Sequence, residues 1–207
     1  MVERLAPLSG LAAVLAPIRP DDEDAFSSDQ ALMQAVAEGH AGARRRLAYR
    51  LVHRTRRIAR ALLGNGADAD DAAQQALFEI LAAAPGYRAE ASIETWSKRI
   101  TVRVCLKVAR TRGGRAVIDV DAIPSDFGSV GLADGLPHPV QTYLDRLPDA
   151  QRIALVMRYS LDLGLPEIAE RTGVTIATVR YRLWTGLKRL RAWIDRDVRP
   201  SRRGGEP

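Results

Sequence analysis

Residues 166–183 read PEIAERTGVTIATVRYRL, and this segment determines how the second half of the chain folds. Ala169 is small where two helices must approach closely, Gly173 lies where a turn needs left-handed backbone, and Thr175 can cap a following helix. This pattern predicts two helices joined by a tight turn, a helix-turn-helix, with Val174 packed into its core.

The second helix of this motif has two chemically different faces. Its apolar positions form a stripe that we expect to be buried: Ile176, Val179, Leu183, Leu187, Leu190 and Ile194. The opposite face carries Arg180, Tyr181, Trp184, Lys188, Arg189 and Arg191. Arginine can pair with guanine in a major groove, and further cations can hold phosphates, so the motif predicts duplex DNA binding. The alternative is a solvated Arg-rich face, with Trp184 or Trp193 packed on the domain.

Helical periodicity extends over most of the chain. Ser28 and Asp29 resemble helix N-caps, and Gly39 is placed to end that first helix. Further helices are predicted at 41–63, from the acidic run 68–71 to Pro85, and at 93–110, 139–146, 149–160, 165–172 and 176–195. No run predicts a strand, so the expected class is all-α, with two small helical domains joined by a flexible linker.

The domain boundaries follow breaks in this periodicity. We expect a disordered or loosely structured extension at 1–27, a first domain at 28–110, a flexible acidic linker at 111–138, a second domain at 139–195 and a disordered basic tail at 196–207. The apolar stretch Leu8–Ala16 could be read as part of a signal peptide, but flanking prolines and following acidic residues favour a tail.

The charge is divided in the same way. The net charge of +6 arises from 31 basic and 25 acidic residues. Residues 28–110 carry 14 basic and 8 acidic side chains, and 141–207 carry 13 and 8, whereas 1–27 and 111–140 are net acidic. Two basic bodies separated by an acidic connector indicate polyanion binding, unless the excess only reflects an Arg-rich composition.

Several function classes are excluded by composition. No apolar run approaches the roughly 18 residues of a membrane-spanning helix, so no membrane insertion is expected. The single Cys105 excludes a disulfide framework and, with three scattered histidines, a zinc site of four N/S ligands, and it fits a cytoplasmic location. No phosphate loop or catalytic triad is present, so we expect no cofactor, no metal and no enzymatic activity.

Two segments resemble a known family. The run Leu147-Pro148-Asp149-Ala150-Gln151-Arg152, then Met157-Arg158-Tyr159 and the helix-turn-helix through Arg191, resembles region 4 of the extracytoplasmic-function (ECF) sigma factors of bacterial RNA polymerase. Upstream, Asp68 to Phe78 is similar to the acidic core-binding helix of region 2, and Tyr87-Arg88 with Thr95 to Ile100 is similar to its promoter-melting segment. The two matches cover about 28–110 and 139–192.

The resemblance implies an alternative sigma factor, monomeric when free, that binds the β and β′ subunits of core RNA polymerase and reads minus-10 and minus-35 promoter elements. The implied minus-35 contacts are Thr175, Thr178, Arg180, Tyr181, Arg182, Trp184, Thr185 and Lys188. The implied minus-10 and melting contacts are Tyr87, Arg88, Trp96, Lys98, Arg99, Arg103 and Lys107. The implied core-binding residues are Asp68, Asp71, Gln74, Gln75 and Phe78.

Some assignments stay open at this stage. The alternative for the acidic run is that it only complements a helix dipole, and Trp96 also begins an apolar stripe. Gln75, Glu79, Arg103 and Tyr181 depart from residues common in the family, so no promoter sequence is implied. The linker acids Asp119, Asp121, Asp126 and Asp134 would suit a basic polymerase channel. The resemblance also allows an anti-sigma factor as a further partner. The alternative function is a stand-alone helix-turn-helix regulator with a helical sensing or dimerisation domain.

Overall fold

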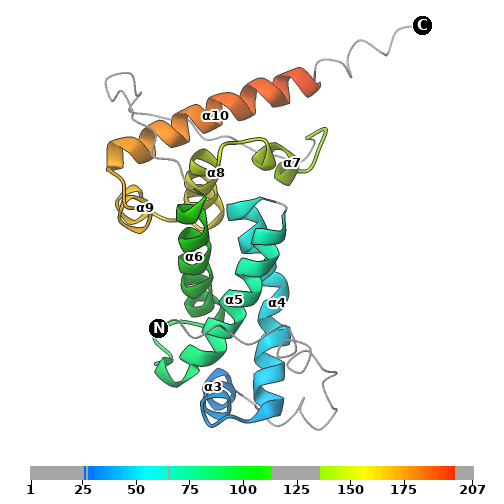
Figure 1. The fold of residues 1–207 in the computed structure, drawn as a ribbon, viewed down its shortest axis with the longest axis vertical. Coiled ribbons are helices and arrows are strands. Elements are labelled where there is room, and N and C mark those ends of the chain that lie inside the picture. The colour runs from blue at the N-terminus through cyan, green and yellow to red at the C-terminus, as the bar shows by residue number, and fades with distance from the viewer. Residues whose placement is uncertain (1–25, 27, 65, 113–135, 199–207) are drawn as a thin grey trace, which may run out of the picture. The chain divides into compact units, whose positions relative to one another are not determined.

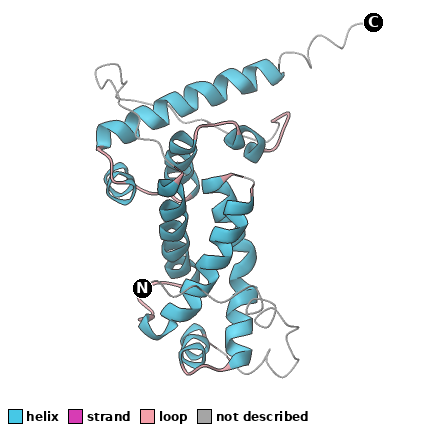
Figure 2. Ribbon diagram, in the orientation of Figure 1, coloured by secondary structure: helices cyan, strands magenta, loops and turns pink. Residues whose placement is uncertain are grey.

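The computed structural model describes residue 26 and residues 28–64, 66–112 and 136–198. Over these residues the chain is helical and contains no strand (Figure 2), which confirms the all-α prediction. The helices are α3 (Asp29–Ala37), α4 (Ala41–Leu63), α5 (Ala67–Ala83), η1 (Ala84–Gly86), α6 (Ile93–Thr111), α7 (Val140–Asp145), α8 (Asp149–Leu155), η2 (Val156–Ser160), α9 (Leu165–Thr172) and α10 (Ile176–Val198).

The chain divides into two compact units, each described by itself below. The first comprises Met1–Ala59 and Ala67–Cys105, and the second Arg60–Gly66 and Leu106–Pro207. The predicted extension at 1–27 apart from Phe26, residues 113–135 of the predicted linker at 111–138, and residues 199–207 of the predicted tail at 196–207 lie outside the described residues. The predicted domain boundaries therefore stay predictions.

The core of the first unit is built by α3, α4, α5 and α6, which lie together in Figure 1. The apolar side chains of α5 form a buried stripe: Ala73, Leu77, Ile80 and Leu81, continued by Ala84 in η1. Leu47 and Leu51 of α4, Leu32 of α3 and Ile100 of α6 form one cluster with Leu77, Ile80, Leu81 and Ala84. Helical spacing of apolar residues on four helices thus produces one shared core.

In the second unit α10 packs on α8 and α9 (Figure 1). Val179, Leu183, Leu187 and Leu190 are buried as predicted. Gly186 lies on the same face, where a Cβ atom would come within 2.8 Å of the Leu155 Cδ1 atom. The absence of a side chain at this position therefore allows α8 and α10 to approach closely.

Two expectations for α10 are wrong in detail. Ile176, expected in the buried stripe, is 42% exposed because it is the first residue of the helix and projects beyond the packed surface. The helix also continues to Val198 rather than ending at 195. Its last turns contact α7, since the Arg146 guanidinium lies 4.7 Å from the centre of the Trp193 ring and 3.9 Å from the Asp197 carboxylate. These contacts hold the additional turn in place.

Candidate functional site

The turn of the helix-turn-helix has the geometry that its sequence predicts. Gly173 has a φ of +71°, and its N–H donates to the carbonyl oxygen of Glu170 at 3.3 Å. The N–H of Val174 donates to the Ala169 carbonyl at 3.1 Å, which completes a Schellman motif at the end of α9. Thr175 then caps α10, because its Oγ1 atom accepts from the Thr178 N–H at 3.1 Å. Hydrogen bonds at the end of α9 and at the start of α10 therefore fix the path of the chain through the turn.

The solvent side of α10 presents cations beside aromatic rings. Arg180 and Lys188 are exposed, while Tyr181 and Trp184 are half-buried. The two rings lie 6.3 Å apart, and the Lys188 ammonium group lies 5.4 Å from the centre of the Trp184 ring. Trp184 is thus neither a core residue nor freely exposed, and its ring forms a cation–π contact with Lys188 at the surface.

The remaining predicted residues of this motif do not all share that face. Arg182 is two positions from Arg180, about 200° around the helix, and it is half-buried. Its burial lowers the pKa of the guanidinium, although an arginine stays charged at neutral pH. The Thr185 hydroxyl donates to the Tyr181 carbonyl at 2.8 Å, so its proton is used within the helix. Arg180 and Lys188 are the better placed for a ligand.

A second row of cations follows α6. Arg99, Arg103 and Lys107 are four residues apart and all exposed, so they share one strip of the helix. Lys98 lies off this strip and is half-buried. Arg103 donates through Nη2 to the Glu79 Oε2 atom of α5 at 3.0 Å. The strip therefore combines exposed cations with one cation held by a neighbouring carboxylate.

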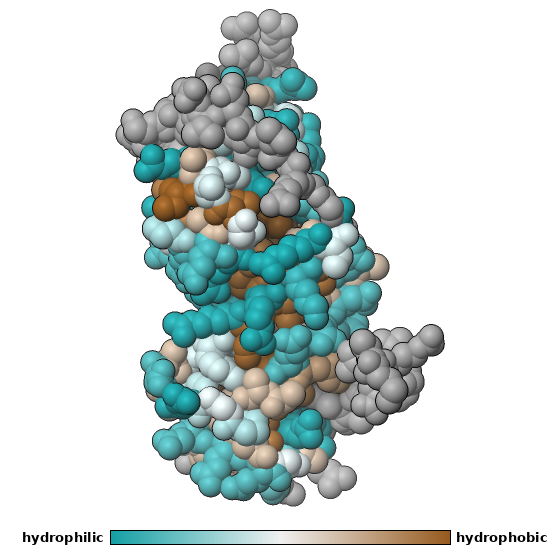
Figure 3. Space-filling view, turned by 60° about the vertical axis from the view of Figure 1, so that its left-hand side comes forward, coloured by the Kyte–Doolittle hydropathy of each residue, from teal (hydrophilic) through white to brown (hydrophobic). Residues whose placement is uncertain are grey.

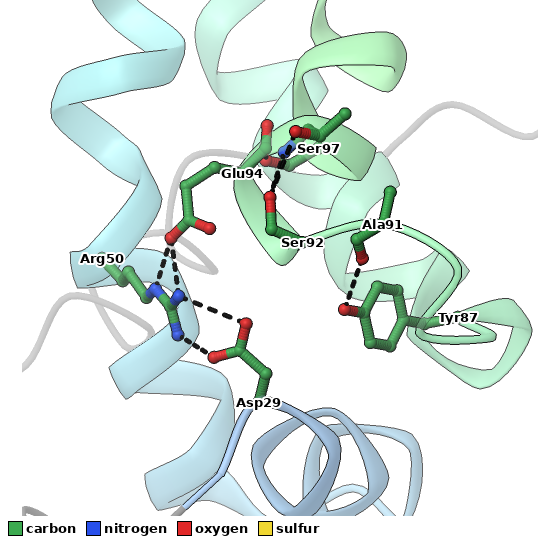
Figure 4. A network of polar contacts seen from close by, with 8 residues as sticks. Asp29, Arg50, Tyr87, Ala91, Ser92, Glu94 and Ser97 are labelled. Atoms are coloured by element: carbon green, nitrogen blue, oxygen red, sulfur yellow. Dashed lines mark hydrogen bonds and ion pairs between the residues drawn. The ribbon is translucent and has the colours of Figure 1, made fainter.

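The loop between η1 and α6 is held by local hydrogen bonds (Figure 4). The Tyr87 hydroxyl donates to the Ala91 carbonyl at 2.8 Å, and Ser92 Oγ accepts from the Thr95 N–H at 3.3 Å. The Tyr87 ring meets Trp96 edge-on, with centroids 5.4 Å apart. Both rings are half-buried against the core of the first unit, so Trp96 does have the packing role considered from sequence. Partial burial raises the pKa of Tyr87, which keeps its hydroxyl a donor.

Sequence reasoning missed Arg50 of α4, which joins three helices (Figure 4). Its guanidinium lies 2.6 Å from Asp29 Oδ1 on α3 and 2.6 Å from Glu94 Oε1 on α6. The hydrogen bond to Asp29 is the main cause that raises the pKa of Arg50. The partners are 21 and 44 residues away in sequence, so no local spacing could have indicated them. Because Glu94 is in the first turn of α6, this network fixes where the loop ends.

A pocket opens beside the same loop in the first unit. Its volume is about 300 Å³, and the lining side chains come from α3, η1 and the loop.

 The residues that line this pocket are Gln30, Met33, Gln34, Ala37, Ala84, Pro85, Tyr87, Arg88 and Ala89. One aromatic ring and one exposed cation therefore border a cavity at the surface of the first unit.

One face of α5 carries the residues predicted to bind core polymerase. Asp68, Asp71, Gln75 and Phe78 are spaced by three and four residues, which places them on the same side of the helix. Phe78 is 38% exposed although it is a large apolar side chain, while Gln74 and Gln75 are half-buried. The face thus combines acceptors with an exposed aromatic ring, as protein interfaces often do.

On the face drawn in Figure 3 most side chains are hydrophilic, and the hydrophobic ones gather in patches between them. Within the described residues, no helix is both long and apolar enough to cross a membrane. The one cysteine, Cys105, is buried, and its burial raises the pKa of the thiol to about 12, so it is not a thiolate nucleophile at neutral pH.

Comparison with known families assigns both halves of the chain. The model of sigma-70 region 2 matches residues 37–115, and the model of sigma-70 region 4 matches residues 138–190. The first match includes the α5 face, the loop and the α6 strip, and the second includes the helix-turn-helix.

Two relatives found by sequence comparison agree with this assignment. The ECF RNA polymerase sigma factor SigE of Mycolicibacterium smegmatis is 30% identical over 198 residues, which cover 86% of this chain and 70% of the relative. The RNA polymerase sigma factor SigV of Bacillus subtilis is 30% identical over 142 residues, covering 68% and 84%. The solved structure of the sigma factor RpoE from Bartonella quintana, in complex with the anti-sigma factor NepR, matches with a TM-score of 0.46 and 20% identity, covering 72% of this chain and 95% of that one. The chain belongs to the ECF sigma factors of the sigma-70 family and is an alternative RNA polymerase sigma factor.

Proposed function

We propose that this sigma factor divides its work among three surfaces: the α5 face for core polymerase, the α6 strip with the neighbouring loop for the melted minus-10 strand, and the solvent side of α10 for the minus-35 duplex. The observation that carries the proposal is the separation of exposed cations onto two helices. Arg99 and Arg103 belong to the first unit, whereas Arg180 and Lys188 belong to the second. Two separate cationic faces allow one protein to contact two promoter elements.

The α10 face suits duplex DNA. A recognition helix enters the major groove with the residues near its N-terminus facing base edges. Arg180 is the fifth residue of α10 and exposed, so it can reach guanine O6 and N7, while Lys188, two turns later, can hold a phosphate. The Thr175 cap and the Gly173 turn fix the angle at which this helix leaves α9.

The first unit suits a single strand. A base drawn out of the duplex loses its stacking, and aromatic rings or arginine planes can replace that stacking. The 300 Å³ pocket beside Tyr87 and Arg88 offers such a place, and the cations of α6 can hold the strand that leads to it. Arg50 supports this arrangement by tying the first turn of α6 to α3 and α4.

The α5 face supplies the docking surface for core polymerase, with the β′ subunit as the expected partner. Bond chemistry then belongs to the polymerase, and the sigma factor contributes binding and strand opening in the cytoplasm. This assignment depends on Phe78, which is exposed despite its size, and on the acceptors Asp71 and Gln74 beside it.

The test is reconstitution with core polymerase. Replacing Asp71 and Gln74 together with alanine should weaken association with core at least tenfold, because one charge and one amide leave the centre of the interface. Glu38→Ala, at the exposed end of α3, is the matched control and should change nothing. Factor-dependent run-off transcription measures the consequence. Unchanged core affinity in the double variant would remove the α5 face from the proposal.

A further inference from the structure

The cation in the middle of the α6 strip is held by a carboxylate. Arg103 Nη2 lies 3.0 Å from Glu79 Oε2, and the Arg103 side chain is 69% exposed. The second carboxylate oxygen, Oε1, accepts from Gln75 Nε2 at 3.4 Å. Glu79 is therefore engaged from both sides, and its carboxylate is oriented toward Arg103.

The ion pair between Arg103 and Glu79 matters more for the orientation of Arg103 than for the stability of the fold. Exposed pairs contribute little to folding, because solvent screens them and the side chains lose freedom. The pair does orient the planar guanidinium, since one of its N–H groups is directed at Glu79. It also places a negative charge beside Arg103, which disfavours an incoming phosphate.

The neighbours on the strip behave differently. Arg99 and Lys107 are exposed one turn before and one turn after Arg103, and among the described residues neither forms an ion pair with a carboxylate. A phosphate can therefore approach Arg99 or Lys107 without displacing an acidic group. At Arg103 a neutral hydrogen-bond acceptor is favoured instead, such as the edge of a base.

We propose that Arg103 reads a base of the melted minus-10 strand, and that Glu79 is the positioning residue that directs Arg103 to a base instead of a phosphate. The preferred base carries adjacent acceptors, as guanine does with O6 and N7. This inference rests on the proposed role of α6 at the minus-10 element.

The first experiment measures base preference. Holoenzyme, reconstituted from the full chain and core polymerase, binds a pool of fork-junction DNA randomised over the single-stranded minus-10 segment, and bound sequences are counted. Both Arg103→Ala and Glu79→Gln should lower the preference at one and the same position by about 5- to 150-fold. Glu38→Gln is the control and should leave every position unchanged.

The second experiment measures salt dependence on a sequence selected from that pool. Arg99→Ala should reduce the slope of log affinity against log salt by about 0.7, the value for one phosphate contact on a single strand. Arg103→Ala should leave the slope unchanged. Glu79→Gln frees Arg103 for a phosphate and should steepen the slope by about 0.7, an effect that disappears in the Arg103→Ala background.

Each contrary result has a distinct meaning. If Arg103→Ala reduces the slope as Arg99→Ala does, Arg103 is a phosphate contact and the inference is wrong. The inference is equally wrong if Glu79→Gln steepens the slope in the Arg103→Ala background as well, because Glu79 then acts only by repelling the DNA. A wild-type holoenzyme with no preference anywhere in the pool would overturn both this inference and the proposed role of α6.

Discussion

At the scale of single residues, Arg180 is the side chain best placed to choose a base in the minus-35 duplex. It is exposed near the start of a helix whose entry is fixed by the Gly173 turn and the Thr175 cap. Arg180→Ala should cost about 1–3 kcal/mol at one base pair and relax the preference there. Competition binding of holoenzyme with promoter variants at that position measures the effect. A uniform loss across all variants would make Arg180 a phosphate contact.

Residues whose role is local were predictable from sequence. Gly173 and Thr175 act on atoms within a few positions, so their types alone indicated a left-handed turn and a cap. The ion pairs of Arg103 and Arg50 could not be predicted in this way. Their partners Glu79, Asp29 and Glu94 lie 21 to 44 residues away, and only the packing of helices brings them together.

At the scale of elements, periodicity predicted which helices form better than where they end. The ranges of α4 and α9 agree with the predicted 41–63 and 165–172, because glycines follow both helices. The predicted end of α10 at 195 was wrong because the last turn depends on contacts of Trp193 and Asp197 with Arg146 of α7. The predicted burial of Ile176 was wrong for a related reason, because an apolar repeat in the sequence does not reveal where the surface that packs against the helix ends.

The junction of α3, α4 and α6 yields a prediction at this scale. Arg50→Ala removes ion pairs to Asp29 and Glu94, which are partly exposed, so the expected loss is about 1 kcal/mol. Hydrogen exchange should accelerate roughly fivefold in the first turns of α3 and α6. Arg57→Ala, at an exposed position of the same helix, is the control. Equal exchange in the two variants would show that the junction does not hold the loop.

At the scale of the whole molecule, the net charge of +6 is less informative than its distribution. The segments predicted to be basic from sequence contain the α6 strip and the α10 face, and Arg99 and Arg103 of the strip belong to a different unit from α10. The acidic residues of the predicted linker lie outside the described residues. Sequence therefore predicted that there are two cationic bodies, while the structure was needed to find which cations are exposed.

Two independent cationic faces should make additive contributions to promoter binding. Arg99→Ala should reduce the salt slope of holoenzyme binding by about 0.7 and Lys188→Ala by about 0.9, the values for single-stranded and duplex phosphates. The double variant should lose about 1.6, because Arg99 and Lys188 lie in different units and share no partner among the described residues. Filter binding over a series of salt concentrations measures all three slopes. A double variant no worse than either single variant would mean that the two faces do not engage the promoter at the same time.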